Sequence, residues 1–476
     1  ATPVIDAAGN LLDSTLGGGV ADQISFVVQT IDPSAVITPV SPDPRLRDAG
    51  LVTVTFSQPV QGVDISDFSL TRDTGIGPQP VSLQNVTVIR DPSGPGADQY
   101  VIDLTSVTGS DGNYVLTLNA EGSGITAIAT GDPMTSDAIE SWSTITTITV
   151  NTTNDTVDVD PGDGIVADAG GNVSLRAAIM EANALVGNDR IVVPAGVYAL
   201  TLPGAGGNVS SAGDLDITET TGSLTIVGAG AGLTIIDARS IERVFHILGG
   251  ATLNLEGVTV TGGLVTGSED GGGIRNDGGT VSIIDSVITG NVSQDDAGGI
   301  NNTGNLTLTR VTVSNNSAAR TGGGIRNSGN LTINASTIGG TSDPADPLAS
   351  DLRNKSVLAG GGIVNLGTGV LTINNSTIAG NVATSSAAQG AGLYSIGTAS
   401  LTNVTIAENE AGGQGGGLAV AGGTTSLLNT LIGDNNSVTT TANDVFESTN
   451  NAVLIVTLGN NLVENRTGAT AAFPAP

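Results

Sequence analysis

The sequence predicts an all-β protein in which an antiparallel β-sandwich is followed by a parallel β-helix with three short strands per turn. Three observations lead to this prediction. A glycine-punctuated repeat runs from about Gly271 to Asn435, short alternating apolar runs separated by turn residues precede it, and a single amphipathic helical pattern stands between the two. We expect that helix to cover the first turn of the solenoid.

The repeat contains the segments GGGIRN, LTI and STIxGN, and its last asparagine marks each copy. The markers are Asn291, Asn316, Asn381, Asn409 and Asn435, with Thr341 standing in for one copy and a long loop, Asp343 to Leu358, inserted before Asn381. Copies of roughly 25 residues are typical of solenoids, in which each copy forms one structural unit. We therefore expect one turn of the solenoid per copy.

Apolar residues align between copies, and β-branched residues dominate them, which indicates strands. The third strand of the copies carries Val260, Ile288, Val313, Ile338, Ile378, Ile406 and Ile432. One turn cannot stand alone, because fixing each residue costs on the order of 1–2 kcal/mol, so stacked turns must share their backbone hydrogen bonds. Like residues then form columns, and we expect an asparagine ladder of Asn276, Asn302, Asn327 and Asn365.

Composition excludes several function classes. The 476 residues include 15 Lys and Arg against 45 Asp and Glu, giving a net charge of −30, so we expect no nucleic-acid partner and a preference for divalent cations. Without cysteine, the chain has neither thiol catalysis nor disulfides. No run approaches 18 apolar residues and no signal-peptide pattern is present, so the sequence predicts no direct membrane insertion and is typical of an excised or mature segment.

Residues 33–150 alternate apolar and polar side chains in short runs between Pro, Gly and Asp turns, which predicts an antiparallel sandwich. The segments from Val54 to Val60 and from Gly62 to Leu70 resemble Ig-like repeats that occur in tandem on bacterial surface proteins. Residues 1–32 resemble the terminal strands of a preceding, truncated copy. We expect these strands to be ordered and to pair with a sheet edge of residues 33–150 or of a neighbouring chain.

Carboxylates are concentrated where the sandwich meets the solenoid. Asp158, Asp160 and Asp163 lie at close spacing around glycine, and oxygen ligands in such a loop suit Ca²⁺. The loop lacks the glutamate of an EF-hand. The sequence therefore predicts Ca²⁺ as the one candidate cofactor, with a solvated interdomain turn as the alternative.

The helix is predicted over about 174–184. Ser174 is a suitable N-cap, and the following apolar residues recur at i, i+3, i+4 and i+7, namely Leu175, Ala178, Ile179 and Ala182. An open solenoid end exposes strand edges and apolar interior. A short amphipathic helix covers both, so we expect a cap at this end.

Several motifs together resemble one family. The segments are Asn172 to Ala184, Gly213 to Ile217, Leu224 to Gly230, Ile235 to Ala238 and Arg243 to Ile247, with Asp444-Val445 and Gly459 to Asn465 near the end. They resemble the CSLREA-type start and the closing part of exported bacterial right-handed β-helix proteins with varied anchors, and the copies resemble repeats of polymorphic outer-membrane proteins. Val173 replaces the family's usual Cys and Ala177 its usual Glu, so the capping box with Ser174 is lost.

The resemblance implies a right-handed parallel β-helix over 151–470, a short tail at 471–476, and a secreted or bacterial cell-surface location. Because parallel β-helices also occur in pectate lyases and polygalacturonases, polysaccharide cleavage is the enzymatic alternative. Asp295 and Asp296 lack a nearby aromatic residue for a sugar. For Arg275 and Arg326 we expect salt or backbone contacts, with no aspartate cluster facing either.

Two further motifs are interpreted as structural. Gly228-Ala-Gly-Ala-Gly is similar to a dinucleotide-binding turn, but the strand pattern Thr234-Ile-Ile follows it where a helix would be needed. His246 is the only histidine and stands between Phe245 and Ile247, which favours a packed or surface-facing residue over a catalytic one. We therefore predict no catalytic and no cofactor-binding residues apart from the calcium ligands.

The sequence thus predicts a non-catalytic bacterial surface module, structural or adhesive, that forms a rigid stalk. Its expected partners are cell-surface or extracellular-matrix components, including glycans, or further copies of the chain in head-to-tail order. A polysaccharide lyase or hydrolase is the first alternative, and a self-assembling extracellular filament or matrix subunit is the second. The ligand, the organism and the anchor stay open.

Overall fold

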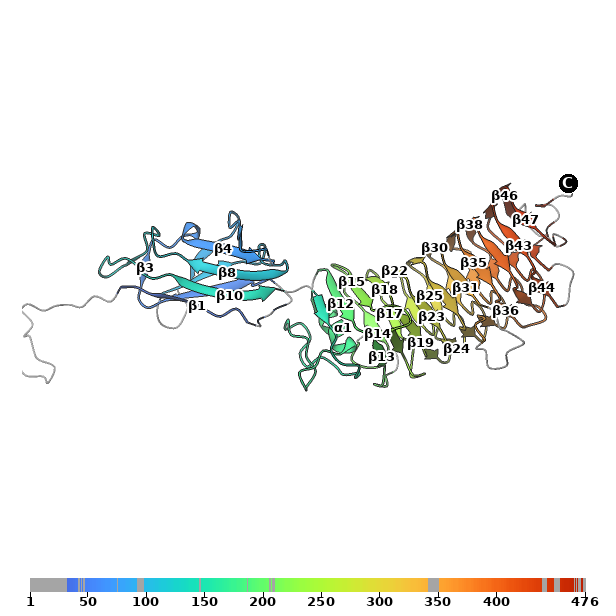
Figure 1. Ribbon diagram of the computed structural model, residues 1–476, viewed down its shortest axis with the longest axis horizontal. Helices are drawn as coiled ribbons and strands as arrows, with labels where there is room; N and C mark the ends of the chain where they lie inside the picture. Colours follow the sequence, from blue (N-terminus) through green and yellow to red (C-terminus); the bar gives the residue numbers. More distant parts are fainter. Residues whose placement is uncertain are drawn as a thin grey trace, which may run out of the picture.

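The computed structural model describes residues 32–476 except 42, 44, 46–47, 75, 92–97, 145–146, 186, 205–206, 208–209, 341–350, 439–442, 449–453, 466, 468, 470–471 and 474–476. The predicted strands of residues 1–32 therefore lie outside the described residues, apart from Asp32 itself. Figure 1 shows the remainder as a β-sandwich followed by a long β-solenoid. Among the described helices, none is long and apolar enough to cross a membrane.

The predicted sandwich consists of two four-stranded antiparallel sheets that enclose one hydrophobic core. One sheet has the order β1 (Ala35–Ile37), β2 (Leu51–Phe56), β7 (Gln99–Asp103) and β6 (Val88–Asp91). The other has the order β10 (Ala138–Thr144), β8 (Gly112–Leu118), β4 (Phe68–Asp73) and β5 (Gln79–Val81). A 3-10 turn (η1, Ile65–Asp67) precedes β4, and β3 (Val60–Gln61) pairs with β9 (Thr126–Ala127). The relation to Ig-like repeats stays a prediction.

Aromatic side chains fill the middle of this sandwich. Trp142 stacks on Tyr114 with ring centroids 5.6 Å apart, and Phe56 meets Tyr100 edge to face at the same distance. All four are buried. Such pairs add to the free energy of area burial, which explains how a chain with so few aromatic residues still forms a compact sandwich core.

In the solenoid, parallel strands from successive turns pair in register and form three long sheets. Sheet 1 contains β11 (Thr147–Thr149), β12 (Asp189–Val193), β15 (Leu224–Gly228), β18 (Thr252–Glu256), β22 (Thr280–Ile284), β26 (Asn305–Thr309), β30 (Asn330–Asn334), β34 (Val370–Asn374), β38 (Thr398–Thr402), β42 (Thr425–Leu428) and β46 (Ile455–Gly459). Sheet 2 contains β13 (Gly196–Ala199), β16 (Thr234–Asp237), β19 (Thr259–Thr261), β23 (Val287–Thr289), β27 (Thr312–Ser314), β31 (Thr337–Gly339), β35 (Thr377–Ala379), β39 (Thr405–Ala407), β43 (Leu431–Gly433) and β47 (Leu462–Val463). Sheet 3 contains β14 (Leu215–Ile217), β17 (Phe245–Ile247), β21 (Ile274–Asn276), β25 (Ile300–Asn302), β29 (Ile325–Asn327), β33 (Ile363–Asn365), β37 (Leu393–Ser395), β41 (Leu418–Val420) and β45 (Val445–Glu447). The predicted parallel β-helix is confirmed.

A fourth sheet corrects the prediction of three strands per turn. Sheet 4 consists of two-residue strands, β20 (Leu264–Val265), β24 (Val292–Ser293), β28 (Ser317–Ala318), β32 (Lys355–Ser356), β36 (Val382–Ala383), β40 (Glu410–Ala411) and β44 (Asn436–Ser437). From β21 to β44 each turn runs through sheets 3, 1, 2 and 4 in that order, and β45, β46 and β47 continue through sheets 3, 1 and 2. A strand of two residues buries one side chain and shows no alternation, which is why the sequence did not reveal it.

The columns of apolar residues form the solenoid core. Val313 pairs with Ile338, and Ile338 pairs with Ile378, in successive strands of sheet 2. Every residue predicted for this column is completely buried. Stacking removes from water the aliphatic side chains that one turn could not bury alone.

Two asparagine ladders run along the solenoid beside this core. In the first, the predicted one, Asn276 donates to Asn302 at 2.7 Å, Asn302 to Asn327 at 2.8 Å, and Asn327 to Asn365 at 2.9 Å. The second joins Asn291, Asn316, Asn354, Asn381, Asn409 and Asn435 by amide hydrogen bonds of 2.9–3.1 Å. All members of both ladders are buried, so each amide finds its partner in a neighbouring turn.

The second ladder corrects the alignment of the copy with the insertion. Asn354 occupies the position that the repeat assigned to Thr341, because it accepts from Asn316 and donates to Asn381. The extra residues therefore lie between β31 and β32, ahead of the ladder asparagine, so the predicted insertion Asp343 to Leu358 extends too far and should end before Asn354. Residues 341–350 themselves lie outside the described residues. The repeat pattern was misleading here because STIGG continues directly into the inserted residues.

The predicted cap is α1 (Leu175–Ala184), whose N-cap Ser174 accepts from the N–H of Ala177 at 3.0 Å. The apolar face of α1 joins the solenoid core, as predicted. Arg176 is almost completely buried and forms an ion pair with Asp155 at 2.5 Å. At the other end of the chain, Ala472 and Phe473, which the sequence placed in a tail, pack on the same core.

Candidate functional site

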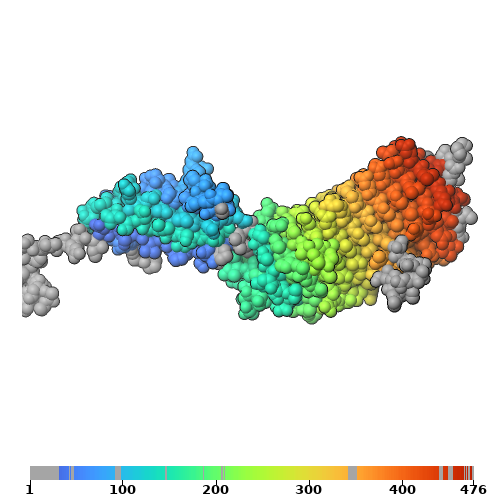
Figure 2. Space-filling view, in the orientation of Figure 1, coloured from blue at the N-terminus to red at the C-terminus, as the bar shows by residue number. Residues whose placement is uncertain are grey.

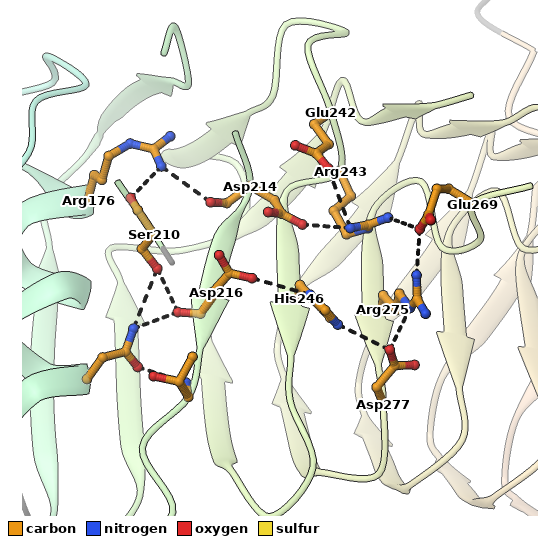
Figure 3. Close-up of polar contacts among 12 residues, drawn as sticks. Arg176, Ser210, Asp214, Asp216, Glu242, Arg243, His246, Glu269, Arg275 and Asp277 are labelled. Carbon is orange, nitrogen blue, oxygen red and sulfur yellow. Dashed lines mark hydrogen bonds and ion pairs between the residues drawn. The ribbon is translucent and has the colours of Figure 1, made fainter. Parts of the chain in front are cut away.

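A column of charged side chains lies on the outer face of sheet 3, near α1. In β17, Phe245 and Ile247 point into the core and are fully buried, so His246 between them points outward. Register places His246 beside Asp216 of β14 and Arg275 of β21. Figure 3 shows these side chains converging with Asp214, Arg243 and Asp277.

His246 lies between two carboxylates. Its Nδ1 is 3.3 Å from Asp216 Oδ1 and its Nε2 is 3.2 Å from Asp277 Oδ2. Burial lowers the pKa of His246, but the contacts with these two carboxylates outweigh it and raise the pKa to about 9. Burial likewise raises the pKa of Asp277, and its contacts with His246 and Arg275 reverse this and lower it to about 2. The imidazole is thus held as a cation between anions at neutral pH.

Asp214 and Arg243 form the inner part of the cluster. Arg243 Nη1 lies 2.9 Å from Asp214 Oδ2, and both side chains are buried. Burial, followed by the negative charge of Asp216, raises the pKa of Asp214 to about 6. Arg243 also contacts Glu269 at 2.8 Å and Glu242 at 3.6 Å, so this guanidinium links three carboxylates.

Asp216 is the least satisfied member of the cluster. Its residue is 0% exposed, and neither carboxylate oxygen has a hydrogen-bond partner, although Oδ1 is at ion-pair distance from His246. Potential ligand atoms of Asp214, Asp216 and His246 all lie within 4.8 Å of one another. Among the described residues this is the one such trio of potential metal ligands.

Sequence reasoning did not identify this trio. His246 was interpreted as packed or surface-facing, and the segment Gly213 to Ile217 served only as part of a family resemblance. The relevant signal was the register between turns, since Asp216 and His246 occupy the same position in consecutive strands of sheet 3. A repeat alignment extended back to these two irregular turns would have placed the two side chains next to each other.

The predicted calcium ligands lie in the junction that precedes α1. Asp158 is buried and accepts from the N–H groups of Asp160 at 3.1 Å and Ala167 at 3.3 Å, whereas Asp163 accepts from Ile165 at 2.7 Å. Burial raises the pKa of Asp158. These bonds shape the loop, and the binding of Ca²⁺ stays a prediction.

Glu181 of α1 belongs to the same junction, which the sequence did not suggest. It is completely buried and accepts from the N–H groups of Gly162 and Gly164, the latter at 2.7 Å. Burial raises its pKa, and the charges of Asp158 and Asp163 raise it further. The cap and the acidic loop are therefore electrostatically connected.

The arginines of the enzymatic alternative are paired with acids. Arg275 contacts Glu269 at 2.5 Å and Asp277 at 2.7 Å. The expected salt contacts are therefore confirmed, but the expectation that no acidic cluster faces Arg275 or Arg326 is wrong. Arg326 lies 3.5 Å from both Asp270 and Asp296 and 3.2 Å from Asn301 Oδ1, and Asp295 pairs with Arg320 at 2.9 Å. Most of these acids come from the loops that precede β21 and β25, and Asp277 directly follows β21. Strand periodicity could not place them.

Comparison with known proteins adds little to this geometry. No family model matches the chain, and no curated protein matches it. Among solved structures, the crystal structure of the N-terminal part of the bacterial S-layer protein SbsC matches 29% of this chain and 32% of that chain, at 20% identity and a TM-score of 0.18. The match thus spans about a third of the S-layer chain, and its low TM-score carries no argument about fold or function.

Proposed function

We propose that this chain is a non-catalytic structural module of a bacterial surface protein, a stalk that holds other segments away from the cell. The observation that carries the proposal is the unbroken parallel pairing of the eleven described strands of sheet 1. Every inner turn is bonded to two neighbours, so bending or melting it requires breaking both interfaces. The elongated shape of the solenoid in Figure 2 supports a role as a stalk.

The ladders and the charge support the same proposal. Buried asparagines joined from turn to turn resist sliding between turns, because a shifted register leaves buried amides unpaired. A net charge of −30 keeps such rods soluble and apart. The export and the surface location rest on the family resemblance, and the expected partners are surface or matrix components, glycans or further copies of the chain.

The outer-face charges fit structural roles. Arg243, Arg275 and Arg326 each lie against at least one carboxylate. A lyase needs an arginine or lysine that is available as a base, and each of these guanidinium groups is already engaged with a carboxylate. We therefore propose that these residues stabilise neighbouring turns.

Two measurements test the stalk. Deleting residues 300–362 removes two turns, and because strands are spaced about 4.8 Å apart, the maximum dimension in solution scattering should fall by about 10 Å while the chain stays folded. An antibody against the solenoid should also label intact cells of the source bacterium. A collapsed or unfolded deletion variant would contradict the modular rod, and labelling only after cell lysis would contradict the surface location.

The enzymatic alternative is tested separately. The chain should release no unsaturated or reducing ends from pectin, alginate or other uronate polymers, with or without Ca²⁺. Turnover that disappears in Arg275→Ala or Asp296→Ala would replace the structural proposal by polysaccharide cleavage. Fibres that grow with protein concentration would support the filament alternative.

A further inference from the structure

We propose that Asp214, Asp216 and His246 bind a divalent transition-metal ion, of which Zn²⁺ and Mn²⁺ are representative, through one oxygen of each carboxylate and Nδ1 of the imidazole. The three residues come from the start of β14 and from β17, two consecutive turns beside α1. An ion at this point would join the first turns of the solenoid. The inference does not depend on the proposed stalk function.

The spacing of the donor atoms fits such an ion. Metal–ligand bonds to histidine and carboxylate are about 2.0–2.2 Å long, so ligand atoms around one ion are separated by roughly 3–4 Å. The three donor atoms lie within 4.8 Å of one another. Asp216 and His246 already pair in adjacent strands, so side-chain rotation is the movement that would bring the donor atoms to the required spacing.

The orphaned carboxylate of Asp216 is an independent indication of a ligand. Burying a carboxylate without hydrogen bonds costs several kcal/mol, yet Asp216 is 0% exposed and neither oxygen has a hydrogen-bond partner. Glu181 provides the contrast within the same protein. It is equally buried, but its two oxygens accept from Gly162 and Gly164. Apart from the ion-pair contact of Oδ1 with His246 Nδ1 at 3.3 Å, the two oxygens of Asp216 have no partner among the described residues and are available to a metal ion.

The ring nitrogen of His246 that would not bind the metal, Nε2, faces a carboxylate, as is usual for metal-binding histidines. Such a histidine donates its second ring N–H to a carboxylate, which fixes the tautomer and the ring orientation. Here Nε2 is 3.2 Å from Asp277 Oδ2, while Nδ1 faces Asp216. Asp277 is held by Arg275 Nε at 2.7 Å. The imidazole is therefore oriented with Nδ1 toward the two carboxylates (Figure 3). An ion that binds there takes the place of the Nδ1 proton of the imidazolium, so binding releases one proton to solvent.

The donor set selects the class of ion. One imidazole with two carboxylates suits Zn²⁺ or Mn²⁺, whereas Ca²⁺ and Mg²⁺ prefer oxygen ligands alone. Arg243 contacts Asp214 Oδ2, which leaves Oδ1 for the ion but places a positive charge nearby. Glu242 and Glu269 also form ion pairs with the Arg243 guanidinium. Their negative charges offset part of the repulsion between this guanidinium and a bound cation.

The test uses the full chain, purified without a histidine tag and stripped of metal. Because His246 is the only histidine and the chain has no cysteine, one imidazole signal in ¹H–¹⁵N spectra reports on the site alone. Zn²⁺ should bind with a stoichiometry of one in calorimetry and should shift that signal, and Co²⁺ should give visible absorption bands. Excess Mg²⁺ should leave both readouts unchanged.

Variants distinguish metal binding at this site from nonspecific binding by carboxylates elsewhere on the surface. Asp216→Asn and His246→Gln should weaken Zn²⁺ binding at least about 100-fold, and Asp277→Asn, which acts through His246, about 10–100-fold. Asp285→Asn, an exposed carboxylate paired with Arg310, is the control and should bind as the parent does. Circular dichroism checks the folding of each variant. Absence of a shift in the imidazole signal on the parent chain, or equal affinity for the parent and Asp216→Asn, would overturn the proposal.

Discussion

Asn435 donates both its backbone N–H and its side-chain amide to the same oxygen of Asp444, at 3.1 and 2.9 Å, and this carboxylate ends the second asparagine ladder. The other oxygen of Asp444 accepts from the N–H of Asn465 at 2.6 Å. Asp444 is almost completely buried. A carboxylate accepts without donating, so it closes a row of amides that would otherwise need one more copy.

Replacing this terminal acceptor should loosen the C-terminal turns first. Asp444→Ala leaves the buried backbone N–H of Asn435 unpaired, which costs about 1–3 kcal/mol, and removes one acceptor from its side-chain amide, which keeps the carbonyls of Ile406 and Gly433. Amide hydrogen exchange should accelerate in β43 and β45 while β22 stays protected. Asp444→Asn keeps one acceptor and is the matched control, expected to give a smaller effect. Uniform acceleration along the whole solenoid would contradict a terminal role for Asp444.

A charge in the core column should destabilise several turns. Ile338→Asp places a carboxylate between Val313 and Ile378, where burial of an unpaired charge costs several kcal/mol. The thermal midpoint should drop by several degrees. Thr337→Asp, at the neighbouring outward-facing position of β31, should shift it little. A midpoint within one or two degrees of the parent for Ile338→Asp would show that the column is assigned incorrectly.

The corrected ladder position can be tested by comparing a buried asparagine with an exposed one. Asn354 accepts from Asn316 and donates to Val313 O and Asn381, so Asn354→Ala should cost about 1–3 kcal/mol for each buried group left unpaired. Asn330 makes an exposed amide contact with Asn305, and Asn330→Ala should change the denaturation midpoint little. Equal effects of the two substitutions would argue against a continuous buried ladder through Asn354.

Asp168 should make the stability of the junction depend on pH. Hydrogen bonds from the N–H of Asn172, and further ones from Thr156 and Gly170, lower its pKa below the usual value. A lowered pKa in the folded chain adds stability above the pKa of the unfolded chain, about 3.9, and this stability is lost as pH falls through the folded value. The difference in urea midpoint between the parent and Asp168→Ala should therefore be full at pH 6 and smaller at pH 3. A difference that does not change with pH would contradict the assigned charge.

The acidic junction that precedes α1 should bind Ca²⁺. If Asp158, Asp160 and Asp163 supply ligands as the sequence predicts, Ca²⁺ should give a saturable heat in calorimetry, and Asp160→Asn should reduce it. His246→Gln should leave this heat unchanged, because imidazole is a poor calcium ligand, which separates this loop from the site on sheet 3. No heat, or the same heat in Asp160→Asn, would remove these residues as ligands.

The solenoid was predictable because the same residue types recur at the same positions in successive copies of the sequence repeat. Ile288, Val313 and Ile338 are separated by equal steps, so each copy confirms the strand and the face assigned to the others. The asparagine ladder was predicted in the same way, because Asn276 and Asn302 occupy equivalent positions in neighbouring copies. The two-residue strands of sheet 4 have no internal periodicity, and one insertion was enough to shift the assignment from Asn354 to Thr341.

The outer-face cluster was not predictable in the same way, because its residues occur once. Asp216 and His246 stand in the two turns nearest the cap, where loops vary in length and the repeat is not yet regular. Their proximity depends on register across 30 positions, and Asp277 and Glu269 reach them from loops. Single occurrences offer no second copy against which an assignment can be checked, so here only the structure supplies the contact.

The position of the inserted residues shows that the length of the solenoid and the size of its loops are independent of each other. Extra chain leaves sheet 2 after β31 and returns at Asn354, so the ladders and sheets pass this turn without interruption. Residues inserted at such a corner lengthen one turn of the chain but add nothing to the length of the solenoid along its axis. Each turn advances the rod by about 4.8 Å whatever its number of residues. The length of the solenoid is therefore set by its number of turns, whereas a loop between strands can lengthen without changing that length.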